Sequence, residues 1–176
     1  MKESKSIVIT GAARGIGEAL ALGYAAPNIA LGLVDRDGER LRIVADVCRA
    51  KGATVDTGHV DVTDHDATVD WLHKFDDARP VDLLIANAGI SIDIDGSSLN
   101  DFSIVRRTLD VNVGGVLNTV EALVGRMMQR RRGQIGLVSS MAGFIGLPHA
   151  GSYNASKAAV RVWGESIRYA LKKHNV

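Results

Sequence analysis

A doubly wound α/β fold, in which helices cover both faces of a parallel sheet, is predicted by two features of this sequence. Short runs rich in β-branched residues alternate with longer stretches of helical periodicity along the 176 residues. The apolar runs at 7–9 and 83–85 are continuous rather than alternating, which is typical of strands buried on both faces. Repeated βαβ units with right-handed crossovers place helices on each side of such a sheet.

Strands and helices are expected to follow one another in a simple order. The strands are predicted at Ser6–Thr10, Ile29–Val34, Thr54–Thr57, Val81–Ala86 and Gln134–Ser139. The helices are predicted to begin near Gly15, Gly38, Asp64 and Asn100, and the last one to span Ser152–Asn175. Because no linker, low-complexity tract or further repeat interrupts the pattern, we expect a single domain over residues 1–176.

The composition excludes several classes of function. With 21 basic and 20 acidic residues, the formal charge of +1 gives no electrostatic basis for binding nucleic acid or an anionic membrane. Cys48 is the only cysteine, so no intrachain disulfide forms and nothing demands an oxidising compartment. The sequence also shows neither a signal peptide nor an apolar run long enough to span a bilayer. We therefore expect a cytoplasmic protein.

No metal site is expected, because the histidines lack the paired spacing of metal ligands. These histidines are His59, His65, His73, His149 and His174. Only His149 stands in a segment of interest, the predicted loop between Ser140 and Tyr153. It is read either as a surface loop residue or as a contact of the substrate.

The first predicted strand runs directly into a glycine-rich turn, Thr10-Gly11-Ala12-Ala13-Arg14-Gly15-Ile16-Gly17, and a helix follows. Glycines let the backbone turn tightly and approach a phosphate, and the helix offers free N–H groups to the anion. A strand before the turn and a helix after it are what a dinucleotide-binding site requires. A purely structural glycine turn is the alternative.

The end of the second strand bears on the choice of cofactor. Asp35 can accept hydrogen bonds from the adenosine ribose of NAD and would repel the 2′-phosphate of NADP. Arg36 and Arg14 stand nearby, and either could pair with that phosphate. The sequence favours NAD, while NADP remains open.

Tyr153 and Lys157 are four residues apart in the last predicted helix, so their side chains lie on one face. An ammonium beside a phenol favours the phenolate. A tyrosine so placed can exchange a proton with a substrate near neutral pH.

Taken together, these motifs resemble the short-chain dehydrogenase/reductase family, in the branch with TGxxxGxG and YxxxK. The resemblance covers nearly the whole chain and implies a Rossmann fold with strand order 3-2-1-4-5. The matching positions are Thr10–Gly17, Asp61-Val62, Asn87-Ala88-Gly89, Asn112, Ser140, Tyr153 and Lys157.

The resemblance implies a catalytic role for four residues. Tyr153 would be the general acid/base, and Lys157 would favour its phenolate and bind the nicotinamide ribose. Ser140 would bind the substrate oxygen, with Ser139 as the competing serine, and Asn112 would hold a water in a proton relay. Donors already aimed at that oxygen would stabilise the charge that builds up there during hydride transfer. Asn112 is also expected to kink its helix.

The resemblance assigns further positions to the cofactor. Asp61 and Val62 would bracket the adenine, and Asn87, Ala88 and Gly89 would pass beneath the nicotinamide half. The glycine turn, with Thr10, Gly11, Arg14, Gly15, Ile16 and Gly17, would hold the pyrophosphate. Substrate contacts are expected from Ser140, His149 and Tyr153.

The predicted function is therefore an NAD(P)-dependent oxidoreductase that acts on a CH–OH/C=O pair in a small molecule. Complete family members are longer, and strands 6 and 7 are expected to be missing from this chain. A truncated, non-catalytic dinucleotide-binding protein is thus an alternative. A nucleotide-sugar epimerase or dehydratase of the extended branch is disfavoured, because that branch has TGxxGxxG. A homodimer or homotetramer is expected through the helices at 100–131 and 152–175.

Overall fold

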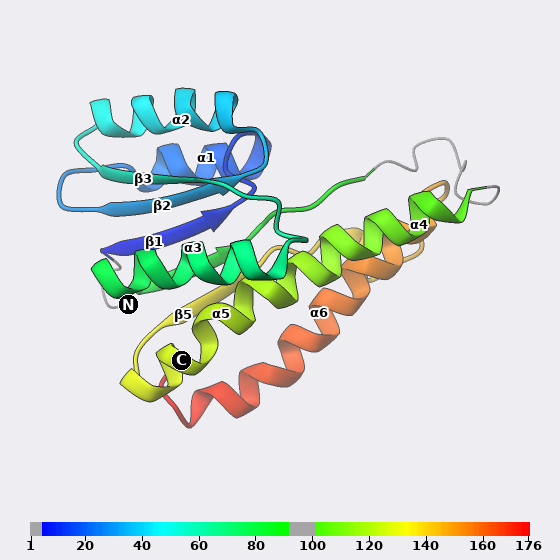
Figure 1. Cartoon of the computed structure of the whole chain (residues 1–176). Helices are drawn as coiled ribbons and strands as arrows, with labels where there is room; N and C mark the ends of the chain where they lie inside the picture. The colour runs from blue at the N-terminus through cyan, green and yellow to red at the C-terminus, as the bar shows by residue number, and fades with distance from the viewer. Residues whose placement is uncertain (1–4, 92–100) are drawn as a thin grey trace.

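The computed structural model describes residues 5–91 and 101–176 and contains, within these ranges, one parallel five-stranded sheet. The strand order β3-β2-β1-β4-β5 confirms the prediction. Figure 1 shows the sheet between two layers of helices. The strands are β1 (Ser6–Thr10), β2 (Ala30–Asp35), β3 (Thr54–His59), β4 (Leu83–Ala86) and β5 (Gln134–Leu137).

Most of the helices fall into two groups. Helices α1 (Gly15–Tyr24) and α2 (Gly38–Ala50) lie on one face of the sheet. On the other face lie α3 (His65–Ala78), α5 (Gly115–Arg130) and α6 (Gly151–Lys172), while α4 (Phe102–Leu109) extends beyond the ends of the strands. The aspartates Asp37, Asp64 and Asp101 cap the N-termini of α2, α3 and α4 by accepting a hydrogen bond from a backbone N–H.

The core explains why the apolar runs are continuous. Ile7 and Ile9 of β1 pack in the cluster formed with α1 and α2, whereas Val8 packs against α3 and α5 on the opposite face. Successive side chains of a strand point to opposite faces. Since both faces are covered, every residue of β1 is buried.

Several boundaries differ from the predictions. β4 begins at Leu83 rather than at Val81, because the N–H of Val81 donates to the Asp76 carboxylate at 2.8 Å instead of to a strand. β3 extends to His59, which pairs with Asp35. β2 is shifted by one residue, β5 ends at Leu137, and α6 spans Gly151–Lys172.

The predicted long fourth helix is interrupted by a π-helical segment. Its expected start, Asn100, lies outside the described residues. From Phe102 the chain runs through α4, then a π-helical turn at Asp110–Gly114, then α5. Asn112 lies within that turn, so the helix is locally irregular there, and the kink expected at Asn112 stays a prediction. Such π-turns release backbone groups and are frequent at functional sites.

One edge of the sheet is formed by β5. Within the described part of the chain, β5 pairs only with β4. Its residues Ile135, Gly136 and Leu137 are partly exposed. Among the described strands, β5 is therefore an edge strand that carries partly exposed apolar residues.

Candidate active site

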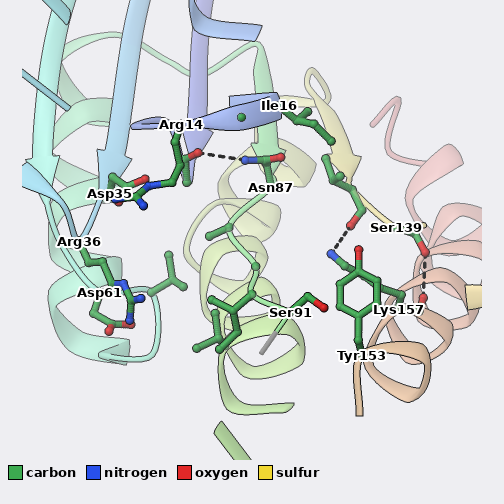
Figure 2. Close-up of a pocket in the computed structure, with 18 of the residues that line it drawn as sticks. Arg14, Ile16, Asp35, Arg36, Asp61, Asn87, Ser91, Ser139, Tyr153 and Lys157 are labelled. Atoms are coloured by element: carbon green, nitrogen blue, oxygen red, sulfur yellow. Dashed lines mark hydrogen bonds between the residues drawn. The ribbon is translucent and has the colours of Figure 1, made fainter. Parts of the chain in front are cut away.

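A cavity of about 450 Å³ opens at the carboxyl ends of the strands. It runs from Asp35 and Asp61 at one end to Tyr153 and Lys157 at the other (Figure 2). Ligands of open α/β sheets bind in this position. The lining residues are Gly11, Arg14, Gly15, Ile16, Asp35, Arg36, Val60, Asp61, Val62, Asn87, Ala88, Gly89, Ile90, Ser91, Val111, Val138, Ser139, Tyr153 and Lys157.

The turn between β1 and α1 faces this cavity with its backbone. Gly11 (φ 68°) and Gly15 (φ 58°) adopt the left-handed conformation that favours glycine. A Cβ on Gly15 would meet nothing within 4 Å, so the backbone there borders open space. The first N–H groups of α1 have no acceptor within the helix and carry the positive end of its dipole. The turn therefore fits a pyrophosphate.

Thr10 and Gly17, two predicted cofactor contacts, do not line the cavity but shape its turn. The Thr10 hydroxyl oxygen accepts hydrogen bonds from Asn87 N and Ala88 N, each at 3.2 Å. The Asn87 Nδ2 donates to the carbonyl oxygens of Thr10 at 2.9 Å and Gly11 at 3.2 Å. These contacts join the carboxyl ends of β1 and β4, and the side-chain amide of Asn87 holds the glycine turn in place.

Asp35 lies at the end of the cavity that is opposite Tyr153 and Lys157 (Figure 2). Its Oδ2 accepts a hydrogen bond from Ala13 N at 2.9 Å, and its Oδ1 accepts one from Asp37 N at 2.9 Å. Both oxygens keep lone pairs for a ribose hydroxyl. Arg14 and Arg36 line the same end, and the Arg14 guanidinium is paired with Asp37.

Asp61 and Val62 follow β3 and line the cavity as the motif predicts. Thr63 donates to Asp61 Oδ1 from its N at 3.0 Å and from its Oγ1 at 2.8 Å, and Arg107 lies 3.4 Å from Oδ2. Burial works to raise the pKa of the Asp61 carboxyl. The Thr63 hydrogen bonds and the charges of Arg107 and Arg36 outweigh burial and hold that pKa below its ordinary value.

Tyr153 and Lys157 lie on one face of α6, at the far end of the cavity (Figure 2). The Lys157 ammonium lies 5.8 Å from the centroid of the Tyr153 ring and donates to the carbonyl oxygen of Val138 at 2.9 Å. Lys157 is only 4% exposed. Burial therefore lowers the pKa of its ammonium.

Asn112 is fully buried beside this pair and joins three segments. Its Oδ1 accepts from Ile90 N at 2.7 Å, and its Nδ2 donates to Ile90 O and to Ser156 Oγ, each at 2.9 Å. A Cβ on Gly89 would lie 3.1 Å from Asn112 Oδ1 and 3.3 Å from Lys157 Nζ. The π-helical turn thus locks the loop after β4 against the helix that carries Tyr153.

Two predicted substrate contacts lie outside the cavity lining. Ser140 caps a short 3₁₀ turn (Met141–Gly143), and its Oγ accepts from Ala142 N at 3.2 Å. Ser139 lines the cavity, and its Oγ donates to Lys157 O at 2.9 Å. His149 is exposed and has a left-handed φ of 57°. The catalytic assignment of Ser140 and the substrate contact of His149 stay predictions.

The family is shown by comparison with known proteins. The model of the short chain dehydrogenase family matches residues 5–176. This chain belongs to the short-chain dehydrogenase family. An uncharacterized oxidoreductase of Myxococcus xanthus is 36% identical over 96% of this chain, and a putative oxidoreductase, SadH, of Mycobacterium tuberculosis is 34% identical over 96% of it.

Solved short-chain dehydrogenases share this fold. One from Mycobacterium paratuberculosis, bound to NAD, has a TM-score of 0.89 and 29% identity, with 97% of this chain and 68% of that chain covered. A metagenomic short-chain oxidoreductase in complex with NADP has a TM-score of 0.89 and 27% identity, with 98% and 77% covered. This chain spans 66% and 61% of the lengths of the Myxococcus and Mycobacterium tuberculosis relatives.

The described residues include neither a candidate metal site nor a candidate membrane-spanning helix. Over residues 5–91 and 101–176, no three histidine, cysteine or carboxylate side chains are grouped so that they could hold a metal ion. In the same ranges, none of the helices is both long and apolar enough to pass through a bilayer.

The motifs of the short-chain dehydrogenases leave part of the cavity wall unassigned. Ser139, the serine expected to compete with Ser140, lines the cavity, and the lining residues that sequence reasoning missed are Val60, Ile90, Ser91, Val111 and Val138. Most of them follow the carboxyl end of β3, β4 or β5. The rule that ligands bind at that edge of the sheet could have found them, although no side-chain type marks them.

Proposed function

We propose that this chain binds a nicotinamide dinucleotide, NAD in preference to NADP. We further propose that it moves a hydride between the dinucleotide and a CH–OH/C=O group of a small molecule. One observation carries the proposal: Tyr153 and Lys157 share the wall of a single cavity with the glycine turn. A phosphate-binding turn alone supports only nucleotide binding. The additional phenol and ammonium at the other end support proton transfer.

The cavity offers suitable groups for each part of the dinucleotide. The backbone around Gly11 and Gly15 would hold the pyrophosphate, and Asp35 would accept hydrogen bonds from the adenosine ribose. Asp61 and Val62 would flank the adenine. The bound dinucleotide supplies the hydride, while the protein supplies orientation and a proton.

Tyr153 would donate its hydroxyl proton to the substrate oxygen in reduction and accept one in oxidation. The Lys157 ammonium lies beside the Tyr153 ring, and Asn112 would hold a water that relays protons to Lys157. Ser140 would donate a hydrogen bond to the substrate oxygen, and such a donor stabilises the developing negative charge. Ser139 is the competing donor, and His149 would contact the rest of the substrate.

The first experiment titrates the chain with NADH and, separately, with NADPH. Energy transfer from Trp71 and Trp163 to the nicotinamide reports binding, and calorimetry checks the result. Saturable binding that favours NADH is expected because of Asp35. A preference for NADPH would move the discriminating role to Arg14 and Arg36, and no binding of either would contradict the proposal.

The second experiment tests turnover with a panel of alcohols and ketones. Tyr153→Phe is expected to lower kcat by about 100- to 10,000-fold, the usual contribution of a general acid/base, while cofactor affinity is kept. Tyr169→Phe is the matched control, because Tyr169 lies on the same helix and is 81% exposed. A wild-type rate for Tyr153→Phe would show that the assignment is wrong. Dinucleotide binding without turnover of any substrate would favour the non-catalytic alternative.

A further inference from the structure

The adenosine end of the cavity carries charges of both signs. Two guanidinium groups, those of Arg14 and Arg36, belong to the lining at this end, and either could bind a 2′-phosphate. Asp61 lies close enough to Arg36 for this cation to lower the pKa of the Asp61 carboxyl. The Arg14 guanidinium forms an ion pair with Asp37, which does not itself line the cavity.

Asp37 is held in place on several sides. Its N–H donates to Asp35 Oδ1 at 2.9 Å, and its Oδ1 accepts the N-capping hydrogen bond from Arg40 N at 3.1 Å. Arg40 Nε in turn donates to the carbonyl oxygen of Ala13 at 2.8 Å. The glycine turn and the start of α2 are thus joined by a small polar network. Asp37 Oδ2 remains available to Arg14.

The carboxyl of Asp37 is ionised at neutral pH. The backbone hydrogen bond from Arg40 and the charge of Arg14 hold the pKa of this carboxyl below its ordinary value. The negative charge of Asp37 therefore offsets the positive charge that Arg14 brings to the cavity wall. Asp35 adds a further carboxylate at the same end. A phosphate placed there would meet the Asp35 carboxylate, the Arg36 guanidinium and an Arg14 guanidinium that is already paired with Asp37.

We propose that Asp37 is a specificity-determining residue, which favours NAD over NADP by keeping Arg14 in an ion pair and away from a 2′-phosphate. This inference rests on the proposed dinucleotide site. It does not require hydride transfer. Asp35 would favour the ribose hydroxyls directly, whereas Asp37 acts through Arg14. In the sequence alone, Arg14 counts in favour of NADP, whereas its ion pair with Asp37 makes it count in favour of NAD.

The test compares the 176-residue chain with its variant Asp37→Asn. Asparagine keeps an oxygen that can accept from Arg40 N, so the N-cap of α2 is preserved while the charge is lost. The ligands are adenosine 2′,5′-bisphosphate and 5′-AMP, which differ only in the 2′-phosphate, and their affinities are measured by calorimetry. In Asp37→Asn the affinity ratio is expected to shift about tenfold toward the bisphosphate, as a charge-assisted hydrogen bond from Arg14 becomes available.

Two further variants make the result specific. Asp37→Asn combined with Arg14→Gln is expected to restore the wild-type ratio, because the released guanidinium is gone. Asp101→Asn is the matched control: Asp101 also caps a helix, accepting from Ser103 N at 2.9 Å, whereas the partner of Arg14 is Asp37. Its ratio is expected to equal that of the wild type.

The outcomes separate this inference from the proposed function. A ratio in Asp37→Asn within twofold of wild type, or a shift that survives Arg14→Gln, would overturn the role of Asp37. Binding of neither nucleotide by any variant would overturn both the dinucleotide site and this role. The expected shift in a protein that turns over no alcohol or ketone would support the role of Asp37 and contradict only the oxidoreductase activity.

Discussion

The carbonyl oxygen of Gly11 lies 2.0 Å from the position that a Cβ on Gly17 would occupy. Asn87 Nδ2, which holds the glycine turn, lies 2.7 Å from the same position. Gly17→Ala must therefore push the turn away from Asn87. We expect a loss of about 1–3 kcal/mol in the free energy of unfolding, the usual cost of overpacking, and a loss of NADH binding, measured by denaturant unfolding and by titration.

Gly23→Ala is the matched control for this prediction. Gly23 also lies in α1, but a Cβ there would meet nothing within 4 Å. Alanine should stabilise the helix by about 0.5–1 kcal/mol and leave NADH binding unchanged. Unaltered NADH affinity in Gly17→Ala would show that the close approach of Gly11 and Gly17 does not shape the phosphate site.

Asp76 of α3 forms a buried ionic network with α5. It is 4% exposed, and its carboxylate contacts Arg130 at 2.9 Å, Arg126 at 3.3 Å and the N–H of Val81 at 2.8 Å. Asp76→Asn leaves both guanidinium groups without this charge. We expect the free energy of unfolding to fall by about 2–3 kcal/mol, less than for a fully buried pair because both arginines keep part of their hydration.

Asp77→Asn provides the comparison for Asp76. Asp77 pairs with Arg126 as well, at 2.5 Å, but its side chain is 64% exposed. A surface ion pair of this kind contributes at most about 1 kcal/mol. Equal losses of stability in the two variants, measured by urea unfolding, would mean that burial of Asp76 adds nothing.

The fold could be predicted from the sequence where local pattern and burial agree. β1 occupies the predicted residues, because the run from Ile7 to Ile9 is buried on both faces. The start of β4 was predicted wrongly because Val81 donates to the carboxylate of Asp76. Hydrophobicity alone does not reveal that a helix side chain competes with the neighbouring strand for the Val81 N–H.

In the candidate site, too, local sequence patterns predicted some residues, whereas contacts between distant segments were not predicted. The glycine turn, Asp35, Asp61 and the Tyr153–Lys157 pair were found because their spacing is a sequence property. The pairing of Arg14 with Asp37 joins residues of two different turns, and no spacing rule predicts it. The wall residues Val60 and Val138 carry no distinctive chemistry and are placed only by the ends of β3 and β5.

Lys157 gives the protein a pH-dependent stability. Burial lowers the pKa of its ammonium in the folded chain, whereas the unfolded chain has the ordinary value of about 10.4. Between these two pKa values the unfolded state binds more protons, so the free energy of unfolding contributed by Lys157 rises with pH. Lys157→Met removes this titration. Relative to wild type, the variant should therefore be most favoured at neutral pH and lose that relative advantage as the pH approaches 10.4.

Lys172→Met is the control for this titration, because Lys172 is exposed near the end of the same helix. The difference in free energy of unfolding between this variant and wild type should not change with pH. Chemical unfolding at a series of pH values measures both differences. A pH-independent difference for Lys157→Met would contradict the lowered pKa.

The last prediction concerns self-association through α5 and α6, which contribute to the same core cluster. Val160 and Trp163 pack into the core cluster beneath α6 and are therefore used within the chain. Val162 is 53% exposed and Leu117 of α5 is 40% exposed, so apolar surface remains on these helices. We expect a homodimer or homotetramer in light scattering at micromolar concentration. Val162→Asp should shift it toward the monomer, because an unpaired carboxylate would be buried in the interface.

Ile43→Asp on α2, where Ile43 is 62% exposed on the other face of the sheet, should leave the mass unchanged. A monodisperse wild-type monomer, or equal effects of the two substitutions, would exclude α6 as the contact.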